Sequence, residues 1–324
     1  MQFKKTFLFT LFIGFILACG WGNLKNKIIK EKTAQTKQSC ELKENTGKTA
    51  EHKQPTITIW VHGTRLITRF ALQEILYGPA GISNICDIPK SCHMHKIARN
   101  LSALDPDRFK IKNFYLFGWS GRLDFNERKK AAEDLYAALT TIAMQYKEQH
   151  GVTPVFRIIT HSHGGNVALN LAEVKREQAP FTVSELILLA CPVQERTKKF
   201  VEDPLFKRVY SLFSRGEFLQ IADPQGIYKE NKNYPLFSKR LFPDHQKLSQ
   251  AEIKIYGRSI LHSEFIFGHF VNKLPAILNV LDKEQQMGAK VSKKNAETDY
   301  VIIDLKKKQV SKNKRRRIRK IVLT

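Results

Sequence analysis

Hydrophobic and polar positions alternate in blocks along the middle of the chain, and the block lengths predict strands and helices in turn. Apolar, β-branched runs of strand length occupy 56–61, 109–119, 155–159, 184–190, 208–214 and 252–260. Helical periodicity occupies 126–150, 166–174 and 267–281, and Gly151 ends the first of these helices. Strands that alternate with helices predict the α/β class, a mainly parallel sheet with helices on both faces.

Polar flanks set the limits of this folded part. Residues 20–55 are polar and rich in lysine, and we expect a flexible linker there. The folded domain is predicted over 56–281, and a basic, loose tail over 282–324, although 300–305 has the pattern of a short strand. Within the domain, 66–104 is a mixed segment with turn signals, and we expect it to shape a ligand pocket.

The first nineteen residues have the pattern of a targeting segment. Two lysines, Lys4 and Lys5, precede an apolar run over 6–18, which is too short to span a bilayer comfortably and is typical of a secretory signal. The run ends Ile-Leu-Ala-Cys at Cys19, which resembles a bacterial lipobox, whose cysteine is lipidated. This predicts an exported, membrane-anchored lipoprotein; the alternatives, an ordinary signal peptide or an uncleaved anchor, also take the chain out of the cytoplasm.

The net charge of the chain indicates which classes of partner it is expected to bind. The chain has 324 residues and a formal net charge of +24, and ten basic residues lie within 306–320, without an acid among them. Such a surface favours anionic membranes or nucleic acid. The predicted anchor makes a membrane the expected partner and nucleic acid the unlikely one, while a solvated tail without any partner is the alternative.

The five cysteines could form disulfides, remain free thiols or bind a metal ion. Cys86 and Cys92 are close enough to close a small loop, so we expect a disulfide or two free thiols. His93 and His95 follow directly, which makes a Cys/His metal site the alternative, but the spacing matches no familiar zinc pattern. Cys191 follows an apolar run and is expected in the core. The sequence implies no cofactor and no metal.

The segment 155–169 carries the clearest chemical signal. A strand breaks sharply at Ser162 and a helix follows at once, with Thr160 two residues before the serine and Gly164 two residues after it. Small neighbours let the two backbones approach while the hydroxyl stays clear. The segment resembles the nucleophile elbow of the α/β-hydrolase family, Gly-x-Ser-x-Gly, with Thr160 at the first glycine. The plainer alternative is a β-turn with a polar cap.

A second motif strengthens the resemblance. The strand 56–61 ends in His62-Gly63, about a hundred residues before the elbow, and resembles the oxyanion loop of the same family. The resemblance implies that the backbone N–H groups of Thr64 and His163 form the oxyanion hole.

The resemblance also implies a triad in the order serine, acid, histidine. Glu217 directly follows the strand 208–214 and is the expected acid, with Asp223 as the alternative. His262 follows the last predicted strand and is the expected base, with His269 as the weaker alternative.

Other polar or aromatic residues near these motifs have plainer roles. His161 and His163 flank the serine and are expected to point away from it, and His62 is expected to hold its own loop. Trp119 lines a pocket or packs in the core.

Together these residues resemble the lipase-like serine esterases of the α/β-hydrolase family over 56–281. The resemblance implies hydrolysis of a carboxylic ester through an acyl-enzyme, and the predicted anchor and charge favour a lipid or acyl ester as substrate. The alternative, since Thr160 and Glu217 depart from the family pattern, is a non-catalytic hydrolase-like lipoprotein that binds an anionic partner through its tail.

Overall fold

The computed structural model describes residues 54–65, 77–175, 179–216, 218–222, 235, 237–288, 300–305 and 319–323. The predicted signal segment 1–19 with Cys19, nearly all of the linker 20–55 and both candidate acids, Glu217 and Asp223, lie outside these residues. None of the helices in the described ranges is long and apolar enough to cross a bilayer.

One sheet of ten strands organises the molecule, in the order β10-β9-β7-β6-β5-β4-β1-β3-β2, with β8 paired to β7. The strands are β1 (Thr56–Val61), β2 (Gly81–Asn84), β3 (Phe114–Gly118), β4 (Val155–His161), β5 (Thr182–Leu189), β6 (Val209–Phe213), β7 (Leu248–Ile255), β8 (Arg258–Ser259), β9 (Val301–Leu305) and β10 (Arg319–Leu323). Among the strands of the described residues, only β2 and β8 run antiparallel to their neighbours. The mainly parallel sheet is therefore the one that the strand–helix alternation predicts.

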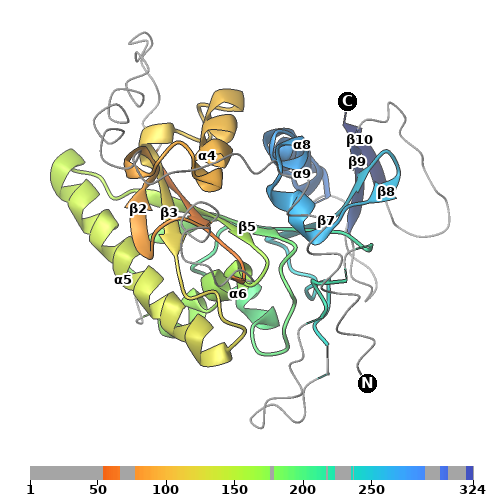
Figure 1. Ribbon diagram of the computed structural model, residues 1–324, viewed down its shortest axis with the longest axis horizontal. Coiled ribbons are helices and arrows are strands. Elements are labelled where there is room, and N and C mark those ends of the chain that lie inside the picture. Colours follow the sequence, from red (N-terminus) through yellow and green to blue (C-terminus); the bar gives the residue numbers. More distant parts are fainter. Residues whose placement is uncertain are drawn as a thin grey trace, which may run out of the picture.

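Helices cover both faces of the sheet (Figure 1). One face carries α4 (His93–Leu104), α8 (Gly268–Val271) and α9 (Leu274–Gly288), and the other carries α5 (Phe125–His150), α6 (Gly164–Leu169) and α7 (Leu171–Val174). Alternate residues of each strand enter the two cores: Ile158 packs on the α5 side, whereas Ile159 packs on the α4 side. Because β4 is buried on both faces, it is apolar at successive positions.

Four predicted elements are divided in the structure. The expected strand 109–119 consists of a short 3-10 helix, Ile111–Asn113, followed by β3, and the expected helix 166–174 is split at Asn170 into α6 and α7. The expected strand 252–260 is a hairpin, since Tyr256 and Gly257 have positive φ values of 52° and 77° and turn the chain back as β8. The expected helix 267–281 is split into α8 and α9. Pro275 explains the break, because its ring would clash with the carbonyl of Val271 in a continuous helix.

The C-terminal segment has more structure than a wholly loose tail. α9 continues to Gly288, and β9 pairs in parallel with β7 as the sequence pattern at 300–305 allows. β10, within the stretch expected to be loose, pairs in parallel with β9 at the edge of the sheet. The residues 306–318, which hold most of the basic run, lie outside the described residues.

The cysteine loop differs from both sequence expectations. Cys86 is disulfide-bonded, but Cys92 is a free thiol, so the two do not pair with each other and the partner of Cys86 lies outside the described residues. Cys92 is only 2% exposed because it packs into the core at the start of α4. The described residues contain no cluster of three or more side chains able to hold a metal ion, and His93 instead hydrogen-bonds the carbonyl of Ile266.

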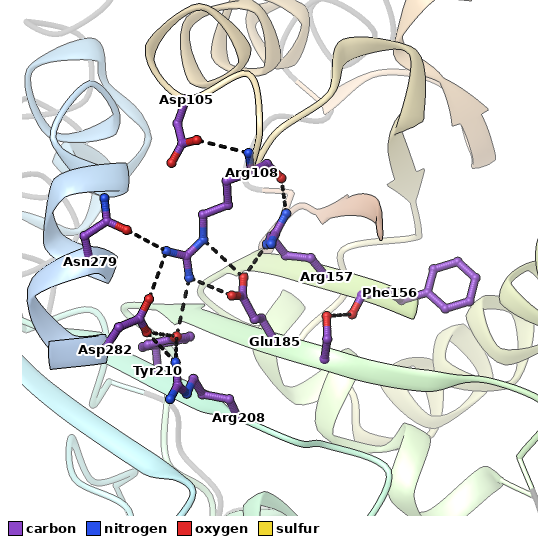
Figure 2. A network of polar contacts seen from close by, with 10 residues as sticks. Asp105, Arg108, Phe156, Arg157, Glu185, Arg208, Tyr210, Asn279 and Asp282 are labelled. Carbon is purple, nitrogen blue, oxygen red and sulfur yellow. Dashed lines mark hydrogen bonds and ion pairs between the residues drawn. The ribbon is translucent and has the colours of Figure 1, made fainter. Parts of the chain in front are cut away.

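A network of charged side chains ties the amino ends of the strands to α9 (Figure 2). Arg108, which precedes β3, donates to Glu185 on β5 at 2.7 Å and to Asp282 on α9 at 3.3 Å. Arg157 on β4 donates to the same glutamate, and Tyr210 on β6 donates to Asp282. The network links α9 to β4, β5 and β6 near the amino ends of these strands. This is the edge of the sheet opposite to Ser162, the predicted nucleophile.

Candidate active site

Ser162 occupies a strained corner between β4 and α6. Its φ is 53°, a left-handed conformation that residues with a side chain adopt rarely and that tends to persist at functional sites. The amide of Ser162 donates to the carbonyl of Leu189 at 2.8 Å, and the amide of Gly165 donates to the carbonyl of Ser162 at 2.9 Å. Hydrogen bonds on both sides therefore hold the corner in this conformation.

Thr160 and Gly164, two residues before and two residues after the serine, pack in different ways. Thr160 is a fully buried strand residue, and its hydroxyl donates to the carbonyl of Ile187 at 3.2 Å, so a threonine fits where the family pattern has glycine. At Gly164 a Cβ atom would lie 2.5 Å from the carbonyl oxygen of His62 and 2.6 Å from that of Val61. Only glycine fits at this second position without moving the backbone.

The His-Gly loop after β1 packs directly against the corner. A Cβ atom on Gly63 would lie 2.8 Å from the Cβ of Ser162 and 2.9 Å from the carbonyl oxygen of His161. Gly63 therefore lies directly against the corner, and Thr64 is the next residue in the chain. On the other side of the serine, His163 is the N-terminal cap of α6. The two predicted oxyanion donors thus come from elements that meet at Ser162.

His62 holds this loop in place. Its Nε2 accepts from the amide of Trp119 at 3.1 Å, so Nδ1 carries the proton and donates to the carbonyl of Gly63 at 2.6 Å. The indole of Trp119 donates in return to the carbonyl of His62 at 2.8 Å. Burial, helped by the nearby charge of Arg65, lowers the pKa of His62 to about 3. His62 is therefore a loop-holding residue, as expected, and of the two roles left open for Trp119 its 5% exposure favours packing in the core.

The segment that carries His262 lies against the same corner. It is the short helix η6 (His262–Ile266), which follows β8. His161 faces the side of the sheet on which η6 lies; its Nε2 is 3.0 Å from the carbonyl oxygen of His262, and the two rings are 4.6 Å apart. Burial is the main cause of the lowered pKa values of His161 and His163, followed by the charge of His262 for His161 and by that of Arg128 for His163. The imidazole of His262 is therefore next to the ring of His161, the residue before Ser162.

His269, the alternative base, lies elsewhere. Its side chain is 44% exposed on α8, and Nε2 is 3.2 Å from a carboxylate oxygen of Glu264. It contacts a carboxylate at the surface, whereas His262 lies beside the ring of His161, so the geometry favours His262.

The described residues next to the two candidate acids, Gly216 and 218–222, contact elements near the corner. At Gly216, directly before Glu217, a Cβ atom would lie 2.6 Å from the Cβ of Ser259 on β8. The side chain of Gln220, between the two candidate acids, is fully buried and donates to the carbonyl of Cys191 at 2.8 Å. Gly216 therefore lies against β8, which leads to His262, and Gln220 lies against the residues that follow β5, next to the elbow.

Three residues, Glu264, Arg258 and His93, hold η6 in place, and the sequence analysis considered only His93, as a possible metal ligand. Glu264 accepts from the amide of Leu261 at 2.6 Å and takes two hydrogen bonds from Arg258, at 2.8 and 2.9 Å. The bonds from Arg258 lower the pKa of Glu264 to about 2. His93 reaches across from α4 to the carbonyl of Ile266 at 2.9 Å. Only the Glu264 contact has a local signal, a glutamate three residues after the start of a turn.

Because two histidines are buried, we expect the free energy of unfolding to fall steeply as the pH is lowered. His62 and His161 both have a pKa of about 3 in the folded protein, mainly because of burial, and an ordinary value near 6.5 when unfolded. The unfolded chain thus binds more protons between these values, so their stabilising effect is complete above pH 6.5 and is lost as pH falls toward 3. Urea denaturation between pH 4 and 5.5 should show a loss of about 1.4 kcal/mol per pH unit for each histidine.

Two variants provide the control for this expectation. His161→Gln should reduce the slope by one proton, whereas His150→Gln, at the exposed end of α5, should leave it unchanged. A slope of less than one proton in the unmodified chain would contradict the burial of these rings in solution.

The topology and the corner together define the fold. The serine corner follows a central parallel strand, the candidate acid loop follows β6, and the candidate histidine follows the β7–β8 hairpin. This is the α/β-hydrolase fold.

No protein-family model and no curated protein matches the chain. Among solved structures it is similar to the thermophilic carboxylesterase EstE1 from a metagenomic library, with 15% identity, a TM-score of 0.36, and coverage of 73% of this chain and 80% of that one. It is also similar to an esterase of Pyrobaculum calidifontis, with 14% identity, a TM-score of 0.37 and coverage of 74% and 78%. A third similarity is to phospholipase PlaB from Legionella pneumophila in complex with thio-NAD, at 19% identity and a TM-score of 0.28; it covers 43% of this chain but only 26% of the phospholipase.

Proposed function

We propose that the protein is a serine hydrolase that cleaves carboxylic esters, with Ser162 as nucleophile and His262 as base. The observation that carries this proposal is the left-handed backbone of Ser162, at φ 53°, held between a strand and a helix and contacted by the glycine of the His-Gly loop. Strain of this kind costs folding free energy, and it is maintained here by hydrogen bonds of the backbone amide and carbonyl of Ser162.

The proposed reaction is acyl transfer in two steps. The Ser162 oxygen attacks the ester carbonyl while His262 accepts the hydroxyl proton, and the amides of Thr64 and His163 bind the oxyanion that forms. The C–O bond to the alcohol then breaks, and His262 returns the proton to the leaving alcohol. Water, activated by the same imidazole, hydrolyses the acyl-enzyme and releases the acid.

The acid of the triad is assigned on position. Glu217 or Asp223 would accept a hydrogen bond from the imidazole of His262 and stabilise its charged form. Two observations support a carboxylate from this loop: Gly216 packs on Ser259, and Gln220 is bonded to the end of β5.

The proposal extends to location and substrate class. An export signal and lipidation at Cys19 would hold the enzyme on a membrane outside the cytoplasm, with lipid or acyl esters within reach. The net charge of +24 supports an anionic surface as its surroundings.

A fluorophosphonate probe tests the proposal directly. We expect the purified full chain to hydrolyse p-nitrophenyl butyrate and to be labelled by the probe at one site, with the modification on a peptide that contains Ser162. Turnover and labelling should decline together as the probe reacts. A folded chain that shows neither turnover nor labelling would exclude the hydrolase and support a non-catalytic lipoprotein with an anionic partner.

A further inference from the structure

Large apolar side chains are unevenly distributed over the described surface. Nine of them are exposed among the described residues, and three of these, Leu104, Met144 and Val152, lie near the amino ends of the strands. The other six lie in segments that follow the carboxyl ends of strands, the edge that holds Ser162: they are Leu123, Phe218, Leu219, Phe237, Tyr256 and Leu261. We call these six residues the apolar rim.

The rim is attached to the elements of the site. Leu261, at 58% exposure, directly precedes His262. Phe218, at 64%, precedes the buried Gln220, whose side chain is bonded to the end of β5. The segment that carries Phe237 is joined to the region after β5 by paired backbone hydrogen bonds of 2.9 Å between Val193 and Lys239. Leu261, Phe218 and Phe237 therefore lie in segments that are joined to elements of the candidate active site.

Exposed cations alternate with the rim along the chain. Arg122 precedes Leu123, Arg215 lies three residues before Phe218, Lys239 lies two residues after Phe237, and Arg258 lies two residues after Tyr256. Their side chains are 55–76% exposed. Each is within 4 Å of a carboxylate, respectively that of Glu127, Glu252, Glu195 and Glu264. The carboxylates are less exposed, at 2–34%, so the pairs hold the cations beside the rim, and the exposed parts of the guanidinium and ammonium groups can still meet phosphate.

We propose that the apolar rim docks on an anionic phospholipid bilayer, so that the ester of a membrane lipid enters the site directly from the membrane. Apolar side chains with cations between them match a lipid–water interface, because the apolar groups enter the acyl boundary while long basic side chains reach the headgroups. The positive charge of the chain complements anionic headgroups. This inference rests on the proposed ester hydrolysis and names the physical state of its substrate.

Tryptophan fluorescence can test the orientation of docking in the full chain. Phe218→Trp places the reporter on the rim, and Met144→Trp is the matched control, because both native side chains are 64% exposed. The probe is a vesicle of phosphatidylcholine and phosphatidylglycerol with a bromolipid quencher. We expect a blue shift and quenching for Phe218→Trp only, relative to the unmodified chain with its own tryptophans.

The same measurement in a Ser162→Ala background separates docking from catalysis, since docking needs no turnover. Equal responses at the two positions, or a response at neither, would overturn the proposal, because attachment by the tail or by an anchor alone does not select the rim. A response of Phe218→Trp to an RNA oligomer and not to vesicles would also overturn it.

An activity ratio gives a second measure. Phe218→Ser should lower turnover of a lipid ester in anionic vesicles, relative to p-nitrophenyl butyrate in solution, by about tenfold, because one buried aromatic contact with the membrane is lost. The Met144→Ser variant should keep the ratio of the unmodified chain. An unchanged ratio in Phe218→Ser would contradict docking through the rim.

Discussion

Ser162→Ala is expected to lower kcat/KM for p-nitrophenyl butyrate by at least about 10⁴-fold. The hydroxyl is the group that forms the acyl-enzyme, and no other step of the proposed reaction replaces it. Alanine keeps the Cβ atom and the positive φ of the corner, so the free energy of unfolding should hardly change. Steady-state kinetics with urea denaturation of the same sample measures both quantities.

Ser184→Ala is the matched control for this experiment. Ser184 lies near the amino end of β5, where its hydroxyl donates to the carbonyl of Phe156 at 3.0 Å. Its loss should cost about 1 kcal/mol of stability and no activity. If Ser162→Ala retains more than about a tenth of kcat/KM while remaining folded, Ser162 is not the nucleophile.

The same assay can distinguish the contributions of the proposed base and acid. His262→Ala should lose activity nearly as fully as Ser162→Ala, and the double variant should lose little more, because the groups act as one unit. His269→Ala should retain activity, since its ring is 44% exposed on α8 and contacts Glu264. The larger loss between Glu217→Gln and Asp223→Asn identifies the acid.

Glu185→Ala is expected to lower the free energy of unfolding by about 3–5 kcal/mol. The carboxylate is 16% exposed and accepts from two guanidinium groups, those of Arg108 and Arg157, whose side chains are 10% and 8% exposed (Figure 2). Burial raises the pKa of Glu185, but the two arginines outweigh burial and lower it overall. Removing the carboxylate would leave two buried positive charges facing each other.

The measurement is urea denaturation at pH 7, with Glu173→Ala as the control. Glu173 accepts from Lys129 at 2.7 Å, but both side chains are about a third exposed, so its loss should cost less than about 1 kcal/mol. Residual native Glu185→Ala should keep its activity toward soluble esters, because the network lies at the opposite edge of the sheet. Equal, small effects of the two variants would contradict a structural role for the network.

The sequence by itself determined the features that are encoded in neighbouring residues. Period-two and apolar runs predicted the strands, and 3.6-residue periodicity predicted α5, because burial on one or two faces imposes these patterns locally. The corner at Ser162 and the His-Gly loop were also predicted, since each is a short segment whose small residues permit close backbone contacts. Chain order alone suggested His262 over His269.

Only the tertiary structure decided which distant side chains meet. His161 binds the carbonyl of a residue 101 positions away, and Arg108 reaches Asp282 across 174 positions. Cys92 is buried under α4 instead of pairing with its near neighbour Cys86. A local pattern records that a position is buried or polar, but a pair of side chains is selected by the packing of the whole sheet, whose strand order places residues far apart in the chain side by side.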